Sequence, residues 1–89
     1  MTGDELFDLA NAVNNRQDFI HFTGQMLINL QNHPGEWEND NLGSFLNGLN
    51  GFSKDMAGYY RNAGEDIDVE NISWRMAAQM LLAASVYGN

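Results

Sequence analysis

Residues 39–61 read NDNLGSFLNGLNGFSKDMAGYYR, and this stretch decides the predicted fold. Its large apolar residues recur at steps of three and four, which places them along one side of a helix. They are Leu42, Phe45, Leu46, Leu49, Phe52, Met56, Tyr59 and Tyr60. A face this wide and aromatic predicts a central helix, against which shorter helices bury their own apolar sides.

Glycines interrupt this predicted helix at Gly43, Gly48, Gly51 and Gly58. Each costs about 1 kcal/mol relative to alanine in a helix interior, so tertiary packing must hold the helix together. A kink or a close helix crossing is easiest at Gly48 and Gly51. We expect one continuous helix over residues 40–61, with a break near Gly51 as the alternative.

Three further helices are predicted, over residues 2–13, 16–32 and 71–87. The first opens on a Thr2 and Glu5 pair that is typical of a capping box, and the second opens on the N-cap residue Asn15. For the other two helices, the sequence offers more than one candidate N-cap residue. Asn39, Asp40 or Asn41 can cap the central helix, and Asn71 or Ser73 can start the last one. We therefore predict an all-α fold, a compact four-helix bundle that forms a single domain over residues 1–89.

The charge balance narrows the classes of partner. The chain has 12 Asp and Glu against 4 Lys and Arg, a net charge of −8 and a pI near 4.2. Phosphate backbones and anionic lipids repel such a surface, so we expect neither nucleic-acid nor membrane binding, and any partner should be basic. With no basic, apolar leader at the N-terminus, we expect a cytoplasmic protein. The oligomeric state stays open.

The chemistry of a catalytic or metal site is missing from the sequence. There is no cysteine, and His21 and His33 lie too far apart for a spacing that holds a metal. No phosphate-binding loop, nucleophile elbow or dinucleotide fingerprint is present. We expect no catalytic residues, no metal and no cofactor, and therefore no enzyme.

Two segments are candidates for protein binding. Trp37 and Glu38 follow a proline turn, where the indole either clamps a cationic side chain or pins the loop to the core. Tyr59 and Tyr60 lie near an acidic loop, and neighbouring helix residues point in different directions, so we expect one tyrosine in the core and one towards the rim. The acids of that loop are Glu65, Asp66, Asp68 and Glu70.

The segment Trp37-Glu38-Asn39 with Leu42, Phe45 and Leu46 resembles part of a family of small bacterial proteins that is known only as a domain of unknown function. The same resemblance extends to a last helix that carries Trp74, Ala77, Leu81, Ala84 and Tyr87. It covers about residues 16–87 and implies a helical fold and a bacterial source. The chain departs from the pattern at Ile72, where a proline is usual, and at Gly88, where an acid commonly follows the tyrosine.

Two further resemblances imply different functions. Tyr59-Tyr60 and the acids up to Glu70 resemble the colicin-nuclease immunity proteins, which are acidic four-helix domains, although Arg61 stands where those proteins have a proline. This likeness implies an inhibitor of a basic protein. Asn41 to Phe45 resembles the attachment site of acyl carrier proteins at Ser44, but lacks the flanking Asp and Leu. We predict a non-enzymatic, acidic, bacterial protein-binding module, with the immunity and acyl-carrier roles as alternatives.

Overall fold

Side chains that cap the helix starts explain where the helices begin. Thr2 accepts a hydrogen bond from the Glu5 amide while the Glu5 carboxylate accepts one from the Thr2 amide, which is the predicted capping box. Asn15, Asn41 and Ser73 each accept a hydrogen bond from the amide three residues further on. Each cap satisfies an amide that the first helical turn leaves without a partner.

The computed structural model describes residues 1–88, and within them it contains four α-helices, one 3-10 turn and no strand. This confirms the predicted all-α, compact fold. The elements are α1 (Gly3–Asn11), α2 (Arg16–Asn32), the 3-10 turn η1 (Pro34–Glu36), α3 (Leu42–Asn62) and α4 (Trp74–Ala84).

The observed bounds refine the predicted ones. The helix α3 is continuous through Gly51, so the alternative of a break there is wrong. Beyond its end, Gly64 has a φ of 77°, a left-handed conformation that suits glycine. The predicted first and last helices were too long: α1 ends at Asn11 and α4 ends at Ala84.

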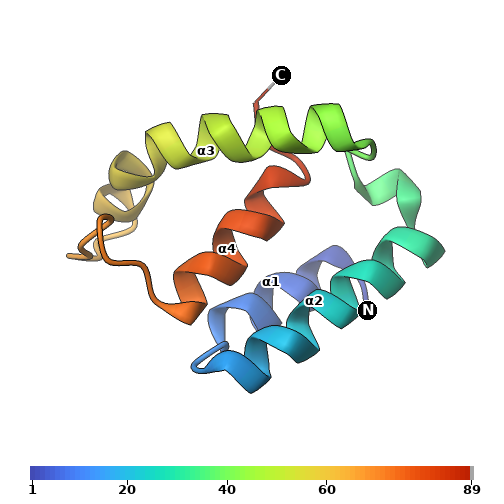
Figure 1. Cartoon of the computed structure of the whole chain (residues 1–89), viewed down its shortest axis with the longest axis horizontal. Helices are drawn as coiled ribbons and strands as arrows, with labels where there is room; N and C mark the ends of the chain where they lie inside the picture. Colours follow the sequence, from blue (N-terminus) through green and yellow to red (C-terminus); the bar gives the residue numbers. More distant parts are fainter. Residues whose placement is uncertain (89) are drawn as a thin grey trace.

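The helix α4 lies at the centre of the molecule, between α3 on one side and the α1–α2 pair on the other (Figure 1). Within the described residues, α3 makes its extensive helix contacts with α4 alone. The prediction that the helix over residues 40–61 is the central one is therefore wrong. The reason is composition: Arg75 is the one charged residue of α4, and a helix that is apolar on nearly all sides is buried.

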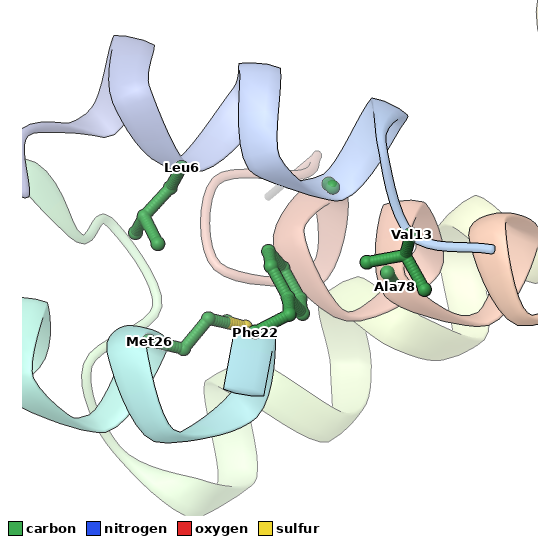
Figure 2. Packing of buried hydrophobic residues seen from close by; sticks show 6 residues of the cluster. Leu6, Val13, Phe22, Met26 and Ala78 are labelled. Atoms are coloured by element: carbon green, nitrogen blue, oxygen red, sulfur yellow. The ribbon is translucent and has the colours of Figure 1, made fainter. Parts of the chain in front are cut away.

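Two clusters of buried side chains reflect this layering. One joins α1, α2 and α4 around the Phe22 ring, which points between the helices (Figure 2). Its members are Leu6, Ala10, Val13, Phe22, Met26 and Ala78. The other joins α3 to α4 through Phe52, Met56, Tyr60 and Met76. Since α4 contributes to both clusters, it links the two halves of the core.

The closest approach of α3 to α4 is at Gly48. A Cβ atom on Gly48 would lie 2.5 Å from the carbonyl oxygen of Ala84 and 2.7 Å from Nδ2 of Asn39. The buried Asn39 donates from Nδ2 to the carbonyls of Ala84 (2.8 Å) and Tyr87 (3.0 Å), and from its backbone amide to the Ser85 carbonyl (2.9 Å). These bonds occupy carbonyls at the end of α4, which explains why the helix ends before residue 87.

The molecule is flat, with extents of 35 × 30 × 18 Å. Part of α4 remains accessible, since Leu82 and Ala83 are only partly buried. Among residues 1–88, no helix has both the length and the apolar character needed to cross a bilayer.

Replacing Gly48 with alanine should destabilise the fold by about 1–3 kcal/mol, because the new methyl group meets a backbone carbonyl that cannot move freely. Gly58→Ala is the matched control. No atom lies within 4 Å of a Cβ atom placed there, so this change should stabilise the protein by about 0.5–1 kcal/mol through helix propensity. Urea denaturation of both variants measures the two effects. Equal stabilities for the two variants would contradict a close crossing at Gly48.

Candidate functional site

An apolar groove runs between α1 and α3, over the exposed side of α4. Its central part has a volume of about 190 Å³. We call it the apolar groove and define it by its lining: Phe7, Ala10, Phe52, Tyr59, Gln79, Leu82, Ala83 and Val86. Its walls belong to helices that lie on opposite sides of α4 (Figure 1). The groove therefore exists because α1 and α3 both pack on α4 and leave one of its sides uncovered.

Three large side chains of the groove remain half exposed: Phe7 at 50%, Tyr59 at 42% and Val86 at 49%. The Tyr59 ring packs edge-on against the Phe52 ring, with 5.4 Å between the two ring centroids. Exposed apolar groups that gather around one hollow make it a candidate binding surface.

The floor of the groove contains a polar side chain that is already satisfied. Gln79 accepts a 2.6 Å hydrogen bond from the Tyr60 hydroxyl and donates a 2.7 Å bond to Oδ1 of Asn11. Both ends of its amide are thus used within the protein. The floor consequently favours an apolar occupant over a polar one.

Charged side chains lie at both ends of the apolar groove. One end adjoins a hollow of about 270 Å³ that shares Phe7 and Val86 with the groove and adds Asp4 and Glu36. The other end adjoins a more open hollow of about 530 Å³ that shares Tyr59 with the groove. Asp55 and Lys54 line this second hollow, and Asp55 accepts a hydrogen bond from the Tyr87 hydroxyl, which raises the pKa of that phenol. The groove ends thus carry more negative than positive charge.

Glu36 belongs to a hydrogen-bond network that anchors the start of the chain. Its carboxylate accepts bonds from the Gly3 amide (3.1 Å) and from Nδ2 of Asn29 (3.0 Å). These bonds hold the pKa of Glu36 below its usual value, the Gly3 amide being the larger cause. The buried Asn29 also donates to the Met1 carbonyl at 2.6 Å and accepts from the Trp37 indole at 2.7 Å. The network fixes the α1 wall of the groove to α2 and η1.

The structure separates the two predicted tyrosines as expected, one in the core and one at the rim. Tyr60 is 1% exposed and bonded to Gln79, and burial raises the pKa of its phenol. Tyr59 faces the apolar groove. Trp37 is partly buried, donates to Asn29, and stacks on Phe45 with ring centroids 6.2 Å apart. Its indole thus pins the loop to the core.

The predicted acids lie in two places that the apolar groove does not include. Glu38 is an exposed residue beside Trp37. Glu65 pairs with Arg75 at 2.8 Å, and with Asp66 it lines a separate hollow at the end of α3. Asp68 accepts bonds from the Glu70 amide and from the Asn71 side chain, which lower its pKa, the Asn71 bond being the larger cause. The ion pair of Glu65 and the hydrogen bonds of Asp68 hold the loop that follows α3, and the acids give this loop a negative charge.

The other residues considered in the sequence analysis, His21, His33 and Ser44, do not line the apolar groove. His21 is exposed on α2, and His33 caps the end of that helix. Within residues 1–88, no group of three or more potential metal ligands comes together. Ser44 lies in the first turn of α3, where its amide and its hydroxyl both bond to Asn41.

The sequence reasoning missed three residues of the groove: Phe7 on α1, Leu82 on α4, and Val86 in the segment after α4. Phe7 follows the buried Leu6 and points away from the apolar stripe of α1, among the polar residues Asp4, Asp8 and Asn11. A large aromatic residue outside a helix's apolar stripe was the available signal. Leu82 carries no such signal, because α4 is apolar almost all round, and Val86 follows the end of that helix.

The model of a family of unknown function (DUF7660) matches residues 15–88. No curated protein and no solved structure matches the chain. The matched segment begins just before α2, so the α1 wall of the groove lies outside it.

The Glu36 network predicts a specific pH dependence of stability. Because the pKa of Glu36 is lower in the folded chain than its ordinary value of 4.5, the unfolded chain takes up the proton first. The stabilising contribution is therefore complete above that value and is lost as the pH falls through the lower, folded-state pKa. Glu36→Gln should remove this component, whereas Glu38→Gln, on a neighbouring exposed side chain, should retain it.

Urea denaturation at a series of pH values between about 2.5 and 6 measures this effect. Glu5 and Asp68 also have lowered pKa values, so the Glu36→Gln variant keeps part of the slope. An unchanged pH dependence in Glu36→Gln would show that the network does not stabilise the folded chain.

Proposed function

The chain belongs to this family of unknown function, and from its surface we propose that it is a non-enzymatic protein-binding module. The apolar groove would take the apolar face of a basic, amphipathic helix from a partner protein. The observation that carries the proposal is the convergence of three half-exposed side chains, Phe7, Tyr59 and Val86, over a floor whose polar group is satisfied.

An apolar occupant is supported by the lining. Apart from Gln79 and the Tyr59 hydroxyl, the side chains around the groove are hydrocarbon. Burying half-exposed aromatic and branched side chains provides a favourable free energy, and tyrosine often dominates the energetics of an interface. A strongly polar ligand would leave its own groups unsatisfied against this floor.

A helical occupant is supported by the backbone of the walls. The groove is bounded by α-helices, whose amides and carbonyls are paired within each helix, so it offers no strand edge to a peptide. A bound segment must satisfy its own backbone, which a helix does. An amphipathic helix lying on α4 would complete the packing on its uncovered side.

A basic partner is supported by the charges. Asp4 and Glu36 lie at one end of the groove, and Asp55 lies with Lys54 at the other. With a net charge of −8, the chain attracts cationic proteins before contact and accelerates encounter with them. Lys or Arg residues at both ends of the partner helix would meet these carboxylates.

A non-enzymatic role accords with the chemistry of the lining, in which the Tyr59 phenol is the one titratable group. The bacterial source is part of the proposal and derives from the sequence resemblance, and a cytoplasmic location is proposed with it. Inhibition of a basic protein, as the immunity proteins perform it, is one form that this binding could take.

A designed peptide probe tests the proposal. The probe is a fluorescent amphipathic helix of leucine and lysine, about 18 residues or five turns long. Two control peptides have the same length, one with glutamate in place of lysine and one with a scrambled, non-amphipathic sequence. We expect saturable binding of the basic amphipathic peptide alone, and weaker binding at about 300 mM than at about 30 mM NaCl.

Phe7→Ser and Ile72→Ser form a matched pair, since both side chains are 50% exposed and Ile72 lies outside the groove. Phe7→Ser should weaken peptide binding about tenfold, equivalent to about 1.4 kcal/mol, while Ile72→Ser should leave it unchanged. Equal affinities for the two variants, or equal binding of the acidic peptide, would contradict the proposed groove.

A further inference from the structure

The outer side of α2 carries an apolar stripe that no other helix covers. Ile20 is 51% exposed and Ile28 is 41% exposed, and Gly24 lies between them with no atom within 4 Å of a Cβ atom placed there. The buried residues Phe22 and Met26 point to the opposite side of the helix. In Figure 1, α2 lies at the edge of the molecule away from α3.

The stripe has a two-fold symmetric order of side chains. Gln17, Ile20, Gly24, Ile28 and Gln31 follow one another at steps of three, four, four and three. A helix turns about 100° per residue, so the five residues lie within an arc of about 80°. Read from either end, the stripe presents glutamine, isoleucine, glycine, isoleucine and glutamine. In an antiparallel pair centred on Gly24, each isoleucine and glutamine of the stripe comes level with a residue of its own kind on the second copy.

The charge distribution favours the same partner. Residues 19–35 contain no Asp, Glu, Lys or Arg, although the chain as a whole has a net charge of −8. Two copies repel each other through most of their surface, but the stripe of α2 brings no like charges together. A basic partner gains no electrostatic advantage from a charge-free surface. The occupant that fits the stripe is therefore another copy of this chain.

We propose that the chain forms an antiparallel homodimer through α2, with the two-fold axis at Gly24. Gly24 of one copy faces Gly24 of the other, which permits a close crossing because neither residue has a side chain. Ile20 of each copy then packs on Ile28 of the other, and Gln17 meets Gln31, where two amides can bond to each other.

The ends of the helices add to this fit. In the antiparallel arrangement, Arg16 of each copy comes to the C-terminal end of the other α2, where the helix carbonyls favour positive charge.

The dimer leaves the apolar groove free, because α1, α3 and α4 line the groove and α2 does not. The inference therefore stands independently of the proposed function. A single pair of helices forms a small contact, so we expect a weak dimer that is half formed at about 100 µM chain.

Sedimentation equilibrium of the full chain between about 10 and 500 µM measures the association. The decisive variants are Gly24→Glu and Gly24→Lys, which place like charges on the two-fold axis of each homodimer. Neither should destabilise the monomer, since space is open at Gly24 and both glutamate and lysine favour the helix over glycine. Each variant alone should dimerise at least tenfold more weakly, and an equimolar mixture should recover a dimer in which glutamate meets lysine.

Gly58→Glu is the matched control, because it adds the same charge at a helical glycine with open space around it, on α3 instead of α2. It should dimerise as the parent chain does. A parent chain that is monomeric at about 500 µM would overturn the proposal. So would an equal loss of dimer in Gly58→Glu and Gly24→Glu, or a mixture of the two Gly24 variants that fails to associate.

Discussion

The contact of Gly48 with the end of α4 is the constraint that fixes how the two halves of the structure are placed relative to each other. Asn39 supplies hydrogen-bond donors to the carbonyls of Ala84, Ser85 and Tyr87, and the absence of a side chain at Gly48 leaves room for that arrangement. The contact ends α4, holds the loop before α3, and sets how closely the two helices approach. Because α3 packs extensively on α4 alone, the position of α3 relative to the α1–α2 pair follows from this junction.

The groove is a consequence of that layering. The helix α4 lies between α3 and the α1–α2 pair, and part of its surface stays accessible, since Leu82 and Ala83 are only partly buried. Here the uncovered part of α4 is apolar, and Phe7 and Tyr59 extend the apolar surface from either side. The geometry that stabilises the fold therefore also creates the surface from which we infer binding. The outer side of α2 adds a second apolar surface, within a segment, residues 19–35, that contains no Asp, Glu, Lys or Arg.

Local patterns in the sequence predicted the helices well, since capping depends on residues a few positions apart. The N-caps Thr2 and Asn15 could be inferred in this way. So could the placement of one of the two tyrosines, Tyr59 and Tyr60, in the core and the other at the rim. The central helix was predicted incorrectly because length and aromatic content favoured residues 40–61, whereas burial follows from the lack of polar residues around α4. The buried roles of Asn29 and Asn39 could not be predicted, because an asparagine acquires such partners only through the tertiary fold. The acids from Glu65 to Glu70 remain a predicted binding surface that the groove does not include.

Native-state amide hydrogen exchange tests the central claim, that α4 holds the two halves of the molecule together. If α4 is packed from both sides, the amides of Ala78 and Gln79 should exchange only through global unfolding and be the slowest in the chain. Amides of α3 should exchange faster, since α3 can separate from α4 while the α1, α2 and α4 cluster stays folded. Slower exchange in α3 than in α4 would contradict this account and restore α3 as the central element.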